Sequence, residues 1–284
     1  MSRAGRVYPS GLFFVPYFFH QTLSGTAIMA EHQQSGRFVW YDLITTDTEA
    51  AIEFYGNIIG WGTEAFEGGP GPYTMLTNNG MPFGGLMEIE PEMGEIPPHW
   101  LPYISTPDVD ETVGQIQELG GNIHVPPQDV PGAGRFAIAT DPQGGVFAVF
   151  ASTTGEPDME AQPGVGEFSW HELATSDYQA AFDFYQALFG WEITSEMDMG
   201  DSGIYRMYGQ NDLVYGGIFT KLDSMPGPPP PWWALYISVE DIDRSVEDVA
   251  EHGGRVVMGP MEVPGGGWIA HCVDPQGARF ALHS

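Results

Sequence analysis

The chain has 284 residues, of which 42% are hydrophobic and 13% aromatic, so it is long enough for two compact domains that each bury a core. Its 38 acidic and 9 basic residues give a net charge of −29 at pH 7, and Lys221 is the sole lysine. Such a surface repels phosphate groups and anionic lipid, which argues against nucleic acid or a membrane as a partner.

The acidic composition also has an environmental interpretation. Dense carboxylates with almost no lysine are typical of proteins that stay hydrated in molar salt, where the Debye length falls to about 3 Å. We therefore expect a cytoplasmic protein of a salt-loaded cell. The alternative is an acidic patch that serves a basic partner.

The N-terminal extension, residues 1–36, has no counterpart elsewhere in the chain. It carries Arg3 and Arg6 ahead of an apolar run at 12–19, an order that superficially resembles a signal peptide. The run is too short to span a bilayer, and the cleavage context that follows it is poor. We expect either a disordered extension or a start assigned too early, with Met29 as the favoured true start.

The rest of the chain consists of two copies of one sequence unit in tandem. The stretch FVWYDLITTDTEAAIEFYGNIIGW, which begins at Phe38, returns as FSWHELATSDYQAAFDFYQALFGW from Phe168. Matched positions lie 130 residues apart at first and 133 apart near the end of the unit, which leaves room for loop changes but not for a new topology. We expect two homologous domains at 37–151 and 167–284, joined by a polar linker at 152–166.

Each unit is predicted to open with a strand that turns at once into a helix. The strands are expected at 38–45 and 168–175, and a capping box follows each of them, with the hydroxyl of Thr46 or Ser176 as the cap. Apolar residues at i, i+3 and i+7 then give each helix one buried face. Short segments punctuated by Gly and Pro follow, as expected for further strands.

A second strand and helix occur within each unit. They are expected at 102–105 and 108–119 in the first copy, and at 235–239 and 241–252 in the second. The last strands follow a DPQG turn in both copies. Each domain is therefore predicted to hold two βαβββ modules, and the fold class is α+β.

Three repeated motifs together resemble the vicinal oxygen chelate superfamily, which includes glyoxalase I, extradiol dioxygenases and bleomycin-binding proteins. They are the helix pattern D-x-x-x-A-x-x-F-Y-x-x-x-x-G-W, the D-(V/I)-D junctions and the DPQG turns, and they run from about Gly36 to Ser284. The chain is most similar to the tandem, two-domain glyoxalase-like members. The resemblance implies curved mixed sheets, each bent around a cavity that takes a small molecule.

In metal-dependent members of this family, inward-facing His and Glu residues bind a divalent ion. The resemblance places those positions at residues that cannot ligate a metal: Trp40, Leu101, Ala148, Trp170, Ala234 and Ala281. Glu88 lies near the remaining position, but one carboxylate cannot hold an ion. We expect no cofactor, and the alternative is a rearranged divalent metal site of His171, Glu172, His271 and His283, although strand alternation directs His171 to the opposite face.

Residues in phase with these positions are expected to face the cavities. Asp42 and Glu172 are the catalytic candidates, since a carboxylate in a dry pocket can have a raised pKa and act as a general base. The substrate-binding candidates are Trp40, Tyr103, Trp170, Tyr236 and His283, with His99 as a further possibility. An aromatic plate beside a carboxylate suits a flat or cationic molecule. In the competing interpretation the rings fill the core and the acids satisfy neighbouring amides.

Three functions remain open. The first is an enzyme or binding protein for a small organic metabolite, which requires at least one open cavity. The second is a non-enzymatic module for sequestration or protein interaction, and the third is a lyase or dioxygenase that uses the rearranged metal ligands of the second domain. A monomer is favoured over a homodimer because each chain already holds four modules.

Overall fold

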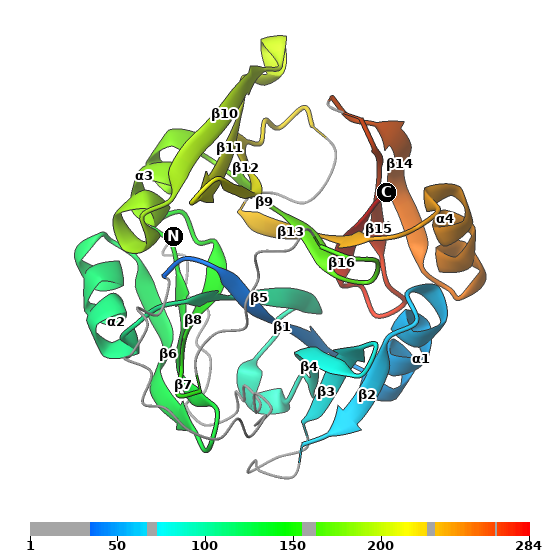
Figure 1. Cartoon of the computed structure of the whole chain (residues 1–284), viewed down its shortest axis with the longest axis horizontal. Coiled ribbons are helices and arrows are strands. Elements are labelled where there is room, and N and C mark those ends of the chain that lie inside the picture. Colours follow the sequence, from blue (N-terminus) through cyan, green and yellow to red (C-terminus); the bar gives the residue numbers. More distant parts are fainter. Residues whose placement is uncertain (1–34, 67–72, 155–162, 226–230, 265) are drawn as a thin grey trace, which may run out of the picture.

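The computed structural model describes residues 35–66, 73–154, 163–225, 231–264 and 266–284. The expected extension at 1–36 lies almost wholly outside the described residues, as does most of the expected linker at 152–166. The described residues form two eight-stranded mixed sheets with four α-helices, so the predicted α+β class is confirmed (Figure 1). No helix among them is long and apolar enough to cross a membrane.

The first sheet has the strand order β2-β3-β4-β1-β5-β8-β7-β6. Its strands are β1 (Phe38–Thr45), β2 (Gly62–Ala65), β3 (Thr74–Asn78), β4 (Met81–Glu88), β5 (His99–Ser105), β6 (Asn122–Val130), β7 (Gly134–Thr140) and β8 (Val146–Ser152). Helices α1 (Thr48–Ile58) and α2 (Val109–Glu118) follow β1 and β5, and a short 3₁₀ turn spans Pro91–Met93. Two βαβββ modules therefore meet where β1 pairs with β5 in antiparallel fashion.

The second sheet repeats this plan with the order β10-β11-β12-β9-β13-β16-β15-β14. Its strands are β9 (Phe168–Thr175), β10 (Glu192–Asp198), β11 (Ile204–Gln210), β12 (Leu213–Thr220), β13 (Trp232–Ser238), β14 (Arg255–Glu262), β15 (Trp268–Val273) and β16 (Arg279–His283). Helices α3 (Tyr178–Phe189) and α4 (Ile242–Glu251) follow β9 and β13, and a 3₁₀ turn spans Gly200–Ser202. The predicted duplication is thus present in the topology as well as in the sequence.

The helix caps differ from the predicted capping boxes. The carboxylate of Asp47 accepts from Ala50 N at 2.9 Å, and that of Asp177 accepts from Ala180 N at 3.1 Å, so the aspartates cap the helices and the preceding hydroxyls do not. A carboxylate is the stronger cap because its charge also offsets the positive end of the helix dipole. The hydroxyl of Ser176 instead donates to Gln143.

The two halves of the molecule share one hydrophobic core. Helix α1 lies beside α4, and α2 lies beside α3 (Figure 1). The Tyr55 hydroxyl donates to Asp274 at 3.2 Å, and the Tyr185 hydroxyl donates to Asp141 at 3.1 Å, so each half reaches into the DPQG turn of the other. Large apolar side chains from both sheets and all four helices fill the space between the sheets.

Successive side chains of β1 and β9 point alternately into this shared core and toward the opposite face of the sheet. Tyr41 and Leu43 enter the core, as do His171 and Leu173 at the matching places in β9. The residues between them, Asp42 and Glu172 among others, point to the other side. Any cavity bent around those faces is therefore lined by Trp40 and Asp42 of β1 or by Trp170 and Glu172 of β9, whereas Phe38 and Phe168, at the strand starts, pack in the shared core.

Candidate functional site

Asp42 is the centre of a hydrogen-bond network on the inner face of the first sheet. Its Oδ1 accepts from the Tyr73 hydroxyl at 2.6 Å and from Trp40 Nε1 at 3.0 Å, and its Oδ2 accepts from the Tyr103 hydroxyl at 2.7 Å. The residues predicted for this cavity therefore do meet. Tyr73, which the sequence interpretation missed, joins them.

The second sheet carries the same network around Glu172. Its Oε2 accepts from the Tyr205 hydroxyl at 2.8 Å, and its Oε1 accepts from the Tyr236 hydroxyl at 3.2 Å. Trp170 Nε1 donates to the oxygen of Tyr205 at 2.8 Å, as Trp40 Nε1 donates to the oxygen of Tyr73 at 2.9 Å. Duplication has thus preserved an acid, two tyrosines and a tryptophan in both halves.

The first network is sealed from solvent. Asp42 and Tyr103 are 0% exposed and Trp40 is 1% exposed. The rest of the inner face is packed with buried apolar side chains, among them Met75, Met87, Met93, Ile96, Phe136 and Phe150. Burial raises the pKa of Asp42 to about 6, although the hydrogen bonds from Tyr103, Tyr73 and Trp40 oppose the shift. In this half the aromatic side chains fill the space that the sequence interpretation left for a ligand.

The second network borders a cavity of about 300 Å³, at the lower end of the range for small-molecule pockets. Its walls include Glu172 itself and six side chains that surround it: Phe219, Lys221, Met225, Trp232, His271 and Arg279. The indole in this wall is that of Trp232, which the sequence interpretation did not name, and not that of the predicted Trp170. Trp170 is not part of the cavity wall, and its indole N–H donates to the Tyr205 oxygen.

The environment of Glu172 suits proton transfer. Burial raises the pKa of its carboxyl group, and the hydroxyls of Tyr205 and Tyr236 partly oppose that shift by hydrogen bonding to the charged form. The carboxyl group is nevertheless only part-buried and lines the cavity, so a bound molecule can reach it. A carboxyl group whose pKa is raised and that borders a cavity can act as a general acid or base toward a bound molecule.

His271 extends this network by one step. The Tyr236 hydroxyl lies 3.2 Å from His271 Nε2, so Tyr236 bridges the carboxylate and the imidazole. Burial, together with the charge of Arg279, lowers the pKa of His271 to about 4, which keeps the ring neutral at pH 7. Because Tyr236 donates its single proton to Glu172, His271 must donate from Nε2 to the tyrosine oxygen.

The remaining predicted histidines lie elsewhere. His283 contacts the Ser169 hydroxyl through Nδ1 at 3.0 Å and is not part of the cavity wall, and His99 Nδ1 contacts the Pro97 carbonyl at 2.9 Å. His171 is in the shared core, where it receives the Tyr41 hydroxyl at 2.6 Å and stacks on Phe38. The rearranged metal cluster of His171, Glu172, His271 and His283 therefore does not form, since alternation places His171 on the other face of the sheet.

Two glycines explain why Tyr73 and Tyr205 reach the acids. A Cβ at Gly217 would lie 2.2 Å from the Tyr205 ring, and a Cβ at Gly85 would lie 2.0 Å from the Tyr73 hydroxyl. Each tyrosine therefore crosses its neighbouring strand at a position that only glycine leaves open. The repeated Gly-Gly pairs at 84–85 and 216–217 were the available sequence signal, but a glycine pair does not say which side chain lies across it.

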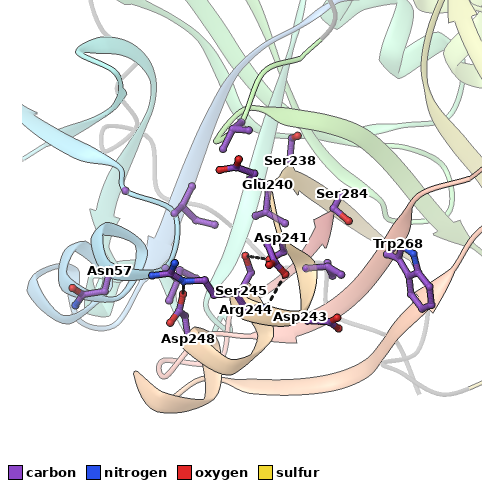
Figure 2. Close-up of a pocket in the computed structure, with 16 residues that line it drawn as sticks. Asn57, Ser238, Glu240, Asp241, Asp243, Arg244, Ser245, Asp248, Trp268 and Ser284 are labelled. Atoms are coloured by element: carbon purple, nitrogen blue, oxygen red, sulfur yellow. Dashed lines mark hydrogen bonds and ion pairs between the residues drawn. The ribbon is translucent and has the colours of Figure 1, made fainter.

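A second, wider cleft of about 900 Å³ lies where α1 meets the start of α4 (Figure 2). Acidic side chains of that region line the cleft, but two of them, Asp241 and Asp248, make their contacts within α4. Asp241 accepts from Arg244 N at 3.1 Å, and Asp248 lies 3.8 Å from the Arg244 guanidinium. Since no buried acid with hydroxyl partners faces this cleft, the smaller cavity beside Glu172 is the candidate site.

The fold and its duplication agree with comparisons to known proteins. The sequence model of the Glyoxalase/Bleomycin resistance protein/Dioxygenase superfamily matches residues 37–149 and 167–282. The chain therefore belongs to this superfamily, in a form that contains the unit twice.

Two relatives span nearly the whole repeat. CFP32 of Mycobacterium tuberculosis, whose description as a glyoxylase is itself provisional, is 34% identical over 246 residues, which cover 86% of this chain and 92% of CFP32. The anthracycline biosynthesis protein DauV of Streptomyces sp. strain C5 is 30% identical over 268 residues, which cover 87% of this chain and 92% of DauV.

Solved structures show the same fold at lower identity. The 2,3-dioxygenase LapB of Pseudomonas sp. KL28 matches with a TM-score of 0.63 at 13% identity, over 88% of this chain and 93% of LapB. The Mn(II)-bound glyoxalase of Novosphingobium aromaticivorans matches with a TM-score of 0.62 at 16% identity, over 88% of this chain and 82% of that one.

The family implies a divalent metal, but the donor set of this cavity does not fit one. Trp170, Tyr236 and Ala281 stand in register across β9, β13 and β16, and Glu172 faces Ala234. Indole and methyl groups cannot ligate a divalent cation. In the described part of the chain, no three His, Cys, Asp or Glu side chains come close enough together to hold an ion.

Proposed function

We propose that the second half of the chain binds a small organic molecule in the cavity beside Glu172, and that Glu172 exchanges a proton with it. The observation that carries this proposal is the contrast between the two acids. Asp42 is sealed, whereas Glu172 keeps the same hydroxyl partners and borders a cavity.

The chemistry is general acid–base catalysis. Glu172 in its charged form removes a proton from a C–H or O–H acid of the bound molecule and returns it to the same or a neighbouring atom. The hydroxyls of Tyr205 and Tyr236 hold the carboxylate in place while it is charged. His271, which reaches Glu172 through Tyr236, couples the acid to a second proton donor.

The walls of the cavity favour a flat, partly aromatic ligand. Trp232 and Phe219 provide rings, and Met225 and Met258 provide polarizable apolar surface that adapts to the shape of a ligand. The description of CFP32 as a glyoxylase and the naming of DauV for anthracycline biosynthesis support a small carbonyl compound or an aromatic one. Sequestration of such a compound without turnover is the alternative that the same walls allow.

The test is the variant Glu172→Gln, with Asp42→Asn as the matched control. A panel of hydroxylated aromatic ketones and small 2-oxoaldehydes is screened for binding by quenching of tryptophan fluorescence. Hits are then followed by NMR for exchange of a ligand proton with D₂O. We expect Glu172→Gln to retain binding but to lose at least about 100-fold in exchange rate, as removal of a general base typically does.

Asp42→Asn should leave the exchange rate unchanged at temperatures where the variant is folded, because Asp42 does not reach the cavity. Ligand binding by the wild type with no exchange would favour sequestration. Equal exchange by the wild type and Glu172→Gln would refute the proposed role of Glu172.

A further inference from the structure

The described part of the chain holds seven basic residues, and two of the four that form no ion pair line the cavity; Arg37 and Arg255 are the other two. In the described part, Arg135, Arg206 and Arg244 pair with carboxylates. Lys221 and Arg279, which both line the cavity, form no ion pair with any described carboxylate. In a chain with 38 acids and 9 bases, two unpaired cations at one small cavity call for a physical reason.

Lys221 follows the last residue of β12 and is only 8% exposed. Its ammonium donates to the Met225 carbonyl at 3.0 Å and makes a longer contact with the Leu222 carbonyl at 3.5 Å. These contacts fix the position of the charge but do not neutralise it, and one of its three N–H donors remains for another acceptor. A buried ammonium without a counter-ion is costly, so an anion in the cavity would relieve that cost.

Arg279 approaches the cavity from the other half of the sheet. Arg255 and Arg279 both pair with Val273 of β15, one from each side, so the two guanidinium groups leave the same face of the sheet. Their charges repel each other, and burial together with Arg255 lowers the pKa of Arg279. A guanidinium presents a planar fork of donors that matches a carboxylate or phosphate group.

A third donor is available close to these cations. The indole N–H of Trp232 is buried and has no hydrogen-bond partner among the described residues. Its ring forms part of the cavity wall together with Lys221 and Arg279. The cavity therefore offers positive charge and N–H donors in addition to the carboxyl group of Glu172.

From this arrangement we infer that the ligand of the cavity is an organic anion, whose charged group is held by Lys221 and Arg279 while its aromatic body contacts Trp232. The inference rests on the proposed function, since it concerns the same cavity. It adds a requirement for a negatively charged ligand. Lys221 and Arg279 bind the anionic group, and Glu172 exchanges a proton with another part of the ligand. The local positive charge would also attract anions to a protein that otherwise repels them.

The experiment compares two probes of the same shape, 2-naphthoate and 2-naphthamide, which differ in charge. We expect the wild type to bind naphthoate at least about 10-fold more tightly than naphthamide, a difference of about 1.4 kcal/mol. Lys221→Gln and Arg279→Gln should each remove most of this preference, because they weaken naphthoate binding far more than naphthamide binding. Naphthoate binding by the wild type should weaken as salt is raised, because screening acts on the charge–charge attraction.

The matched control is Arg135→Gln, which removes one positive charge from an exposed ion pair of the first half. It should leave naphthoate affinity unchanged. Lys221→Arg retains the charge and should keep the preference in part, and Arg279→Gln tests the inference even if Lys221→Gln fails to fold, since Arg279 is exposed.

Equal affinity for the two probes, or an effect of Arg135→Gln as large as that of Arg279→Gln, would overturn the inference. Failure of both probes to bind would overturn it as well. Inorganic phosphate is the competing probe: displacement of bound naphthoate assigns the subsite to phosphate esters, no displacement assigns it to carboxylates, and both results support an anion subsite. The proposed role of Glu172 is judged separately, by proton exchange in Glu172→Gln.

Discussion

Asp42 and Glu172 stand 130 residues apart and accept hydrogen bonds from matching pairs of tyrosines, yet one is sealed in a core and the other borders a cavity. The two halves have therefore kept one network in two environments. In the first half the network is buried among the apolar side chains that pack on the inner face of the sheet. In the second half a gap remains beside it, and the candidate site is there.

Replacing Asp42 should change how stability depends on pH. The pKa of Asp42 is raised from 3.8 to about 6, so the folded state binds this proton more tightly than the unfolded state does. The resulting stability is fully present below pH 3.8 and is lost as the pH rises through about 6, a change on the order of 3 kcal/mol. Asp42→Asn removes this dependence. The free energy of unfolding of the variant, relative to that of the wild type, should therefore increase from pH 4 to pH 7.

Urea unfolding of both proteins at pH 4 and pH 7 in the same salt measures this difference. A gap between wild type and Asp42→Asn that is the same at both pH values would contradict the assignment of the raised pKa to Asp42.

Adding one methyl group at Gly217 should disrupt the candidate site. The new Cβ would lie 2.2 Å from the Tyr205 ring, so the ring must move and its hydrogen bond to Glu172 must lengthen or break. We expect Gly217→Ala to lose about 1 to 3 kcal/mol of stability by overpacking and to weaken binding in the cavity. Thermal unfolding and the fluorescence binding assay measure the two effects.

Gly114→Ala serves as the control for this substitution. Gly114 lies within α2, and a methyl group added there would have no neighbour within 4 Å, so alanine should stabilise the helix by about 0.5 to 1 kcal/mol. Unaltered binding and stability in Gly217→Ala would show that the Tyr205 ring can move freely.

Removing the Tyr41 hydroxyl should destabilise the shared core. His171 Nδ1 lies 2.9 Å from the Tyr215 carbonyl, which can only accept, so Nδ1 carries the proton and Nε2 accepts from Tyr41 at 2.6 Å. Tyr41→Phe leaves Nε2 buried without a donor, which costs about 1 to 3 kcal/mol at pH 7. Tyr178→Phe is the control, because the Tyr178 hydroxyl makes no hydrogen bond within the described residues, and it should cost less than about 0.5 kcal/mol.

The same histidine should contribute a pH dependence of the opposite sign to that of Asp42. Burial lowers the pKa of His171 from 6.5 to about 4, so its contribution to stability is present above pH 6.5 and is lost as the pH falls through about 4. A titration of the His171 ring followed by NMR should show no protonation above pH 5. Protonation near pH 6.5 would mean that the ring is exposed in solution.

Neither half should fold cooperatively without the other. Trp61 Nε1 donates to the Gly166 carbonyl and Trp191 Nε1 donates to the Gly36 carbonyl, each at 2.8 Å, and the tyrosine–aspartate bonds at Asp141 and Asp274 also cross between the halves. Fragments 35–154 and 163–284, expressed separately, should lack a sharp thermal transition by near-UV circular dichroism. Mixing them should restore it, whereas one fragment with the melting temperature of the whole chain would show that its core is independent.

The sequence by itself determined the repeating architecture. Strands β1 and β9 have the predicted bounds, and the helices follow at the predicted places, because alternation with period 2 and helical spacing are local patterns that any short segment displays. Alternation also placed Asp42 and Glu172 on one face of their strands and His171 on the other. The motifs that carried the family resemblance were equally local, since each lies within one turn or one helix.

Only the tertiary structure decided which of the two acids borders a cavity. Packing of the first inner face depends on side chains from distant strands, such as Met75 and Phe136, and no local pattern reports whether their volumes close a space. For the same reason the sequence did not reveal that Tyr205 reaches Glu172 across Gly217. Nor did it reveal that Lys221, which follows β12, and Arg279 of β16 both line the cavity, since these two strands are separated in the sheet by β9 and β13. The face of a strand on which each side chain lies follows from the local sequence. Free volume and unpaired charge arise only when segments far apart in the sequence are brought together.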